Sequence, residues 1–123
     1  MRKRRDTNRI VIQKMVGYCD DIQTLRTRCE DSFERYISDI GFRYACDMCI
    51  LQIGELTTRL TDEFKVQHSD IPWHEIKGLR NIHAHEYESV NLNYMWDTLT
   101  RDIPTLKSQL EKILAAEVEP DEH

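Results

Sequence analysis

Glycine and proline are scarce in this chain, which has four of the first and three of the second among its 123 residues. Sheets of short strands need these two residues at their turns, so the scarcity disfavours a turn-rich β structure. No stretch alternates apolar and polar residues as a half-buried strand would. With 40% hydrophobic and 32% charged residues, the composition predicts one globular, all-α domain.

Long apolar runs are also missing. No run approaches the roughly 18 residues that suggest a membrane-spanning helix, so we expect no membrane segment. The basic start of the chain is not followed by an apolar stretch, so we expect no signal peptide either. These two expectations together favour a cytoplasmic protein.

An excess of positive charge is absent as well, since the net charge is −5 at pH 7. A protein with this balance does not attract nucleic acid through its overall field. The charges are unevenly placed, and we divide the chain into a basic arm (1–6), a helical domain (7–116) and an acidic tail (117–123). We interpret both ends as solvated, and a basic arm that touches RNA is the alternative. The arm carries Arg2, Lys3, Arg4 and Arg5, and the tail carries Glu117, Glu119, Asp121 and Glu122.

The four cysteines lack the spacing of a zinc site. Cys46 and Cys49 form a C-x-x-C pair, but Cys19 and Cys29 stand ten residues apart, whereas zinc calls for a second closely spaced pair of ligands. We therefore interpret all four as small buried hydrophobic residues in a reducing compartment. We expect neither a metal ion nor another cofactor.

What the sequence does have is helical periodicity. Apolar residues repeat at spacings of four and three near both ends of the chain, as on one face of an amphipathic helix. The pattern predicts an up-down bundle of about five helices with short connections. We expect helices over about 7–29, from 32, over 40–60, from 61 to 68, from Pro72 through the following motif, and over 91–113. On the first helix the apolar stripe is Val11, Met15, Tyr18, Ile22, Leu25 and Cys29.

Two helix-disfavouring residues carry information about packing. Gly54 lies inside the third expected helix, where glycine costs about 1 kcal/mol relative to alanine, so we expect another helix to approach closely there. Pro104 lies inside the last apolar stripe and should kink that helix. On the third helix we expect one face to hold Ala45, Cys49, Gln52, Leu56 and Leu60, flanked by Met48 and Ile53.

The segment from Arg80 to Tyr87 gathers a permanent cation, two imidazoles and a phenol. Arginine offers a rigid fork of donors for a phosphate, and histidine exchanges protons near neutral pH. Such groups suffice for metal-independent RNA cleavage: an imidazole would activate the ribose 2′-hydroxyl while a guanidinium stabilises the charge on phosphorus. The alternative, favoured on residue types alone, is a helix end with surface ion pairs.

The spacing within this segment sets a geometric constraint. At about 100° per residue, His83 and Tyr87 fall near the face of Arg80, whereas His85 points well away from it. Arg80 and His85 can therefore converge only if the helix ends near His83, or if another copy of the chain completes the site.

Three further residues allow a structural and a functional interpretation. We expect Trp73 and Trp96 to be core or interface anchors and not base-stacking platforms. Glu55 would pair with Arg59 one turn later, which is the commoner arrangement, or turn inward to hold Arg80.

Taken together, these features resemble a known family. Arg80, His85 and Tyr87 have the pattern R-x4-H-x-Y of the HepT-like toxins in the HEPN superfamily, often called the DUF86 family. The resemblance extends over about residues 7–116. Its other elements are Ile53-Gly54-Glu55 on the central helix, Pro72-Trp73 through Asn81 before the motif, and Trp96 with Ile103-Pro104-Thr105-Leu106 in the final helix.

The resemblance implies a homodimeric, HEPN-like helical bundle with the motif at the dimer cleft, and a metal-independent endoribonuclease activity. Arg80 and His85 would be the catalytic pair, with Asn81 and Glu55 in supporting roles. His83, an extra imidazole within the motif, could share the proton transfer, so the base is His85 or His83.

The resemblance also implies a partner. Members of the family are encoded beside a minimal nucleotidyltransferase antitoxin (MntA-like), which neutralises the toxin by transferring AMP to the motif tyrosine, here Tyr87. A bulky anion there would occupy the phosphate site beside Arg80 and repel RNA. The alternative is a non-catalytic binding module that serves as the regulatory partner of the nucleotidyltransferase. The acidic net charge favours this alternative, and the intact pair of Arg80 and His85 favours the nuclease.

Overall fold

The computed structural model describes the backbone of residues 2–84 and 92–118, with side chains for 7–81 and 92–116. Every regular element in those stretches is a helix and none is a strand, which confirms the all-α fold class. None of the described helices is long and apolar enough to cross a membrane. The elements are α1 (Arg2–Arg28), α2 (Phe33–Ser38), α3 (Ile40–Thr57), α4 (Asp62–Gln67), α5 (Trp73–Gly78), the 3-10 helix η1 (Leu79–Ala84), α6 (Leu92–Asp97), the π-helix η3 (Thr98–Asp102) and α7 (Ile103–Val118).

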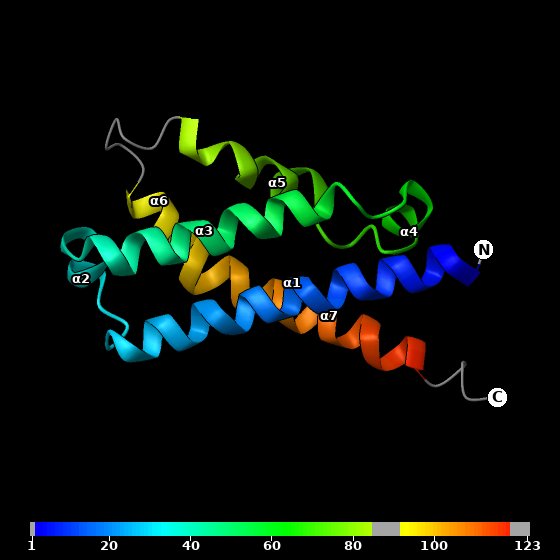
Figure 1. The fold of residues 1–123 in the computed structure, drawn as a ribbon, viewed down its shortest axis with the longest axis horizontal. Helices are drawn as coiled ribbons and strands as arrows, with labels where there is room; N and C mark the ends of the chain where they lie inside the picture. Colours follow the sequence, from blue (N-terminus) through cyan, green and yellow to red (C-terminus); the bar gives the residue numbers. More distant parts are fainter. Residues whose placement is uncertain (1, 85–91, 119–123) are drawn as a thin grey trace.

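Helix α3 lies at the centre of the arrangement. It runs antiparallel to α1 and packs against α5 and η1 on another side, while α7 packs against α1 (Figure 1). The succession of α1, α3, α5–η1 and α6–η3–α7 alternates in direction along the long axis of the molecule, as an up-down bundle does (Figure 1). Because α3 contacts both α1 and α5–η1, it connects the core to the segment that carries Arg80.

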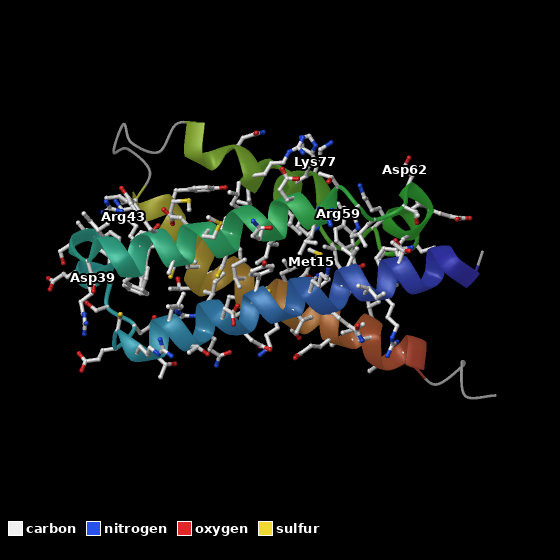
Figure 2. All side chains as sticks on the ribbon, in the orientation of Figure 1. Met15, Asp39, Arg43, Arg59, Asp62 and Lys77 are labelled. Carbon is white, nitrogen blue, oxygen red and sulfur yellow. The ribbon has the colours of Figure 1, made fainter. Side chains whose placement is uncertain are left out.

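The core side of α1 follows the predicted stripe with a small rotation. Met15 and Ile22 are buried as expected, and Met15 lies between α1 and α3 in Figure 2. Tyr18 is only half-buried, and its neighbour Cys19 is buried instead. The helix begins at Arg2, earlier than the expected start near residue 7, because the basic residues before it favour helix and neither Gly nor Pro interrupts them.

The predicted core face of α3 is partly wrong. Met48 is 50% exposed and Gln52 is half-buried, whereas Cys46 and Ile50 are buried. The reason is that α3 carries apolar residues on two sides, so periodicity alone does not say which side meets α1. The helix also ends at Thr57, before the expected residue 60.

Pro104 changes the last helix in a specific way. A proline has no N–H, so the carbonyl of Thr100 lacks its usual partner four residues later. The Ile103 N–H bonds instead to the carbonyl of Thr98, five residues back. The result is the π turn η3 between α6 and α7, where the sequence predicts a kink, and the helix continues through the proline.

Candidate functional site

Gly54 brings Arg80 directly against α3. A Cβ atom at position 54 would lie 2.7 Å from the backbone nitrogen of Arg80, 3.2 Å from its Cβ and 3.1 Å from the carbonyl oxygen of Ile76. Real Cβ atoms essentially never approach another atom within 3.0 Å, so only glycine permits this contact. The predicted close approach at Gly54 is therefore confirmed, and the approaching element is the segment that begins the R-x4-H-x-Y motif.

The Arg80 guanidinium reaches toward α3. Its Nη1 lies 3.9 Å from Oε2 of Glu55, and the two side chains are 35% and 49% exposed. Of the two partners considered for Glu55, the structure thus pairs it with Arg80 and not with Arg59. At this distance and exposure the pair contributes about 0–1 kcal/mol, so it constrains the guanidinium only weakly and leaves it partly exposed.

The α-helix ends before the histidines of the motif. Helix α5 stops at Gly78, and the chain continues as the 3-10 helix η1 to Ala84. Arg80 therefore lies on a tighter helix of about three residues per turn. From the sequence, Arg80 and His85 could converge within one chain only if the α-helix ended near His83. The end of α5 at Gly78 meets that condition.

The described surface beside Arg80 is polar and open. Lys77, one turn earlier, points away from the bundle (Figure 2), and His74 and Asn81 are also exposed. The backbone of His83 belongs to η1, but its side chain is outside the described residues, as are the whole of His85 and Tyr87. The predicted roles of these three residues stay predictions.

Exposed apolar side chains run along α3 toward this site. Ile40, Tyr44 and Met48 are 57%, 48% and 50% exposed and follow one another at a spacing of four, so they share one face of the helix. We call these three residues the outer stripe. Glu55 stands two turns beyond Met48 on the same face. Periodicity missed this surface because it placed Met48 beside the core face, although the spacing of four was a usable signal.

The cysteines lie in the core, as predicted. All four are buried and free of disulfides. Burial raises the pKa of Cys19 and of Cys46 to about 12, and that of Cys49 to about 11. Such thiols are inert at neutral pH. Among the described side chains, no group of histidine, cysteine, aspartate or glutamate is placed to hold a metal ion.

The tryptophans are structural anchors, as predicted. Trp73 is buried, and its indole N–H donates to the carbonyl of His68 at 3.0 Å. Trp96 is half-buried in an aromatic cluster at the other end of the bundle, where its ring centroid lies 5.3 Å from that of Tyr36.

A groove between α5–η1 and α6–η3–α7 is a second feature that sequence reasoning missed. It has a volume of about 460 Å³ and includes Leu79, the neighbour of Arg80, but not Arg80 itself. We call it the α5–α7 groove. Pro104 was the available signal, because it causes the π turn from which part of one wall is built.

Comparisons with known proteins agree with one another. The family model HepT-like, described as "Ribonuclease HepT-like", matches residues 15–113. A protein of Caldanaerobacter subterraneus subsp. tengcongensis named "Putative RNase TTE0752" is 38% identical over 86 residues, which are 70% of this chain and 77% of that protein. A protein of Thermococcus cleftensis named "Probable ribonuclease HepT" is 33% identical over 84 residues, which are 68% and 76% of the two chains. No solved structure matches.

Proposed function

The chain belongs to the HepT-like ribonuclease family, and from this premise we propose that it is the toxin of a toxin–antitoxin pair and an endoribonuclease that needs no metal ion. The matched residues 15–113 span the whole R-x4-H-x-Y motif, including Arg80 and His85. The names of the two relatives above concern RNA cleavage, which supports RNA as the substrate class.

The observation that carries the proposal is the way in which α3 holds Arg80. Its backbone is fixed against Gly54, while its guanidinium stays accessible beside Glu55 at 3.9 Å. A phosphate that binds the arginine fork in two charge-assisted hydrogen bonds is a stronger partner than this long, half-exposed ion pair. The geometry therefore suits a cation that is positioned in advance and released to an incoming phosphodiester.

The proposed reaction is an attack within the RNA strand. His85 takes the proton of a ribose 2′-hydroxyl, whose oxygen attacks the adjacent phosphorus to form a 2′,3′-cyclic phosphate. The bond from phosphorus to the 5′-oxygen of the next nucleotide breaks, and that oxygen takes a proton from water or from a protonated His83. Arg80 stabilises the negative charge that builds up on the phosphorane, as fixed cations do in phosphoryl transfer. Asn81, exposed beside it, orients the phosphate, and His83 is the second imidazole available for proton transfer.

We further propose a homodimer with the site at its interface. The outer stripe is apolar and exposed, and an apolar surface of this kind is typical of a protein–protein contact. It ends on the face of α3 that carries Glu55, so a second copy bound to the stripe would lie close to Arg80. A two-fold arrangement would let Arg80 and His85 of different copies converge, which the angular argument allows.

The proposed regulator is a minimal nucleotidyltransferase antitoxin that transfers AMP to Tyr87. The added phosphate would compete with RNA for Arg80, and its negative charge would repel the substrate. We place both proteins in the cytoplasm, which is consistent with four free cysteines.

One observation favours a second candidate function. The net charge of −5 is unusual for a protein that must attract RNA. A non-catalytic module that binds and regulates the nucleotidyltransferase would need no such attraction. The two candidates differ in whether the protein alone cleaves RNA.

Cleavage of RNA by the purified protein in EDTA, without any antitoxin, tests the nuclease. We expect His85→Ala to lower the rate about 10²- to 10⁴-fold, the usual contribution of a general base. Arg80→Ala should be comparably inactive, and Arg80→Lys should recover little because lysine lacks the fork. Arg59→Ala, which removes an exposed cation outside the motif, is the matched control and should keep the wild-type rate. Intact RNA with the wild-type protein would reject the nuclease and leave the regulatory module.

A mass measurement tests the modification separately. The protein is incubated with ATP, Mg²⁺ and the candidate nucleotidyltransferase, and an added AMP is sought. Tyr87→Phe should abolish it, whereas Tyr94→Phe, which alters a tyrosine that is 56% exposed, should not. Modification that persists in Tyr87→Phe would exclude this tyrosine as the acceptor.

A further inference from the structure

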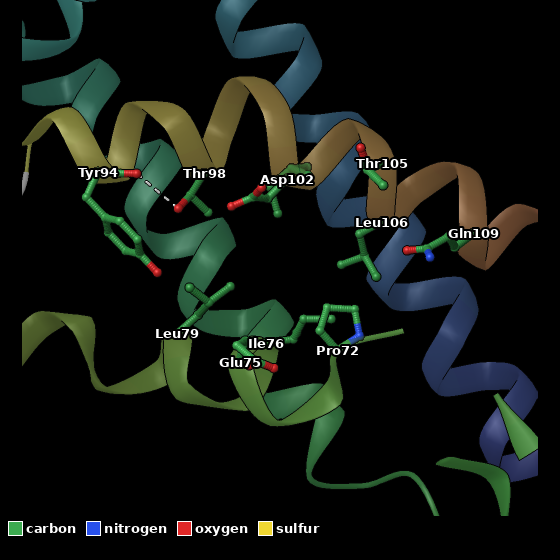
Figure 3. A pocket seen from close by; sticks show the side chains of 11 residues that line it. Pro72, Glu75, Ile76, Leu79, Tyr94, Thr98, Asp102, Thr105, Leu106 and Gln109 are labelled. Carbon is green, nitrogen blue, oxygen red and sulfur yellow. Dashed lines mark hydrogen bonds between the residues drawn. The ribbon is translucent and has the colours of Figure 1, made fainter. Parts of the chain in front are cut away.

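The α5–α7 groove is large enough to hold part of a partner. Its volume of about 460 Å³ lies within the range of about 300–1,000 Å³ that is common for ligand sites. Ile76 and Leu79 form one wall, and they face Tyr94 and Leu106 on the other (Figure 3). Tyr94 is 56% exposed, so its ring is available at one end of the groove.

The charge of the groove's described lining has one sign. Each wall supplies one carboxylate, Glu75 from α5 and Asp102 from η3, and no lysine, arginine or histidine is among the lining residues that the structure describes (Figure 3). Neither carboxylate has an ion-pair or hydrogen-bond partner among the side chains that the structure describes. Two unpaired carboxylates around an apolar floor attract a cation attached to apolar groups, and they repel the phosphates of RNA.

The wall that carries Asp102 is itself unusual. Thr98 and Asp102 both belong to the π turn and both line the groove, so the irregular turn shapes this surface. Single π turns inside α-helices occur frequently at functional sites. The turn results from Pro104, which lies outside the groove lining, and the same chain segment thus provides both the shape and the charge.

We propose that the α5–α7 groove binds a basic amphipathic segment of a protein partner. Apolar side chains of that segment occupy the floor between Ile76 and Leu106, and lysine or arginine side chains lie over Glu75 and Asp102. Leu79 belongs to the groove and its neighbour Arg80 is held by α3, so a partner bound here contacts the segment that begins the motif. The proposal concerns binding alone and is independent of whether the protein cleaves RNA.

Selection from a displayed peptide library tests the chemistry of the partner. The wild-type protein should enrich peptides in which apolar residues alternate with lysine or arginine at helical spacing. Binding of one such peptide is then measured by fluorescence anisotropy. The double variant Glu75→Gln/Asp102→Asn should bind it about threefold to tenfold more weakly, as expected for the loss of two solvent-exposed ion pairs. Tyr94→Ala should weaken it as well, because an exposed aromatic contact is lost.

The matched control is Glu63→Gln/Asp97→Asn, which changes the net charge equally at exposed positions outside the groove and should bind the peptide like the wild type. Absence of enriched peptides, enrichment of acidic ones, or equal weakening in both double variants overturns the proposal. A groove variant that shifts the sedimentation of the protein alone would assign the groove to a second copy of the chain. One that changes affinity for single-stranded RNA would assign it to nucleic acid, and either result also overturns the proposal.

Discussion

The two apolar faces of α3 differ in what covers them. On the inner face Cys46 and Ile53 are fully buried, because α1 and α5–η1 pack against the helix. On the outer face Tyr44 and Met48 are about half exposed, with the Arg43 guanidinium 5.7 Å from the centroid of the Tyr44 ring and the Gln52 amide 3.8 Å from the Met48 sulfur. Apolar composition is thus shared by both faces, whereas burial is not. The difference separates residues that stabilise the chain from residues that are available to a partner.

At Gly54, α3 contacts the segment that carries Arg80. A substitution there should therefore affect both the stability of the chain and the candidate site. Gly54→Ala should have the largest effect on stability of the changes considered. Its Cβ would lie 2.7 Å from a backbone nitrogen, and overpacking of this kind costs about 1–3 kcal/mol or more, which should outweigh the gain of about 1 kcal/mol in helix propensity. We expect a lower free energy of unfolding in urea, and lost RNA cleavage because Arg80 is displaced.

Gly17→Ala is the control for helix propensity. No atom lies within 4 Å of a Cβ built at Gly17, which stands in the exposed middle of α1. Alanine there should stabilise the protein by about 0.5–1 kcal/mol. If the two variants shifted the free energy of unfolding in the same direction, the close approach at Gly54 would be refuted.

Tyr36 of α2, which contacts the buried Asp47 of α3, and Tyr44 on the outer stripe sharpen the comparison. The hydroxyl of Tyr36 donates to Oδ1 of Asp47 at 2.7 Å, and both residues are buried. Burial, followed by the charge of Asp47, raises the pKa of Tyr36, so the hydroxyl stays protonated and remains a donor. Tyr36→Phe should cost about 1–2 kcal/mol in urea unfolding. Tyr44→Phe on the outer stripe should stay within about 0.5 kcal/mol, and an equal loss in both variants would contradict the difference between the buried contact of α2 with α3 and the exposed face of α3.

The extent to which the fold could be predicted depended on local signals. The apolar stripe of α1 and the close approach at the glycine inside α3 could be predicted because each depends on residues within a few helical turns. The core face of α3 was not readable, since Met48 and Cys46 are both apolar and only the packing of α1 distinguishes them. The π turn could not be predicted either. Pro104 predicts a break in the regular helical hydrogen bonds, but not the hydrogen bond from the Ile103 N–H to the carbonyl of Thr98, five residues earlier, that replaces them.

The candidate site shows the same limit. A close approach at Gly54 could be predicted because an interior glycine has an energetic penalty that needs a reason. The choice between the two candidate partners of Glu55 could not be predicted. Arg59 lies one turn away on the same helix, whereas Arg80 comes close to Glu55 only through tertiary packing. The α5–α7 groove lies between α5–η1 and the unit α6–η3–α7 that follows it, and its size depends on how these elements pack, which no local sequence pattern gives.

The buried thiols of the inner face should make stability depend on pH. Burial raises the pKa of Cys46 from 9.0 to about 12, so the folded state holds this proton more tightly than the unfolded state. The stabilisation is complete below pH 9 and is lost as the pH rises toward 12. At pH 9.5 one such thiol should account for about 1 kcal/mol of lost stability.

The measurement is urea unfolding at pH 7.5 and at pH 9.5. In Cys46→Ala the decrease between the two values should be smaller than in the wild type by about this amount. Titration of lysines and tyrosines affects both proteins alike and cancels in the difference. Equal pH dependence in the two proteins would show that the thiol is not sequestered.

Met48→Lys should have the smallest effect on the stability of the chain and a clear effect on its assembly. The side chain is 50% exposed, so the free energy of unfolding at low protein concentration should change by no more than about 0.5 kcal/mol. A lysine in the centre of the outer stripe would be desolvated in a two-fold contact, opposite the same charge in the second copy. We therefore expect sedimentation to show a dimer for the wild type and a monomer for the variant.

Val66→Lys is the matched control, because Val66 is 74% exposed on α4 and outside the stripe; it should remain dimeric. If Met48→Lys is monomeric and cleaves RNA more slowly while Val66→Lys keeps the wild-type rate, the second copy contributes to the site. A monomeric Met48→Lys protein with full activity would separate the two proposals: the outer stripe would still be the dimer contact, but one chain alone would bring Arg80 and His85 together.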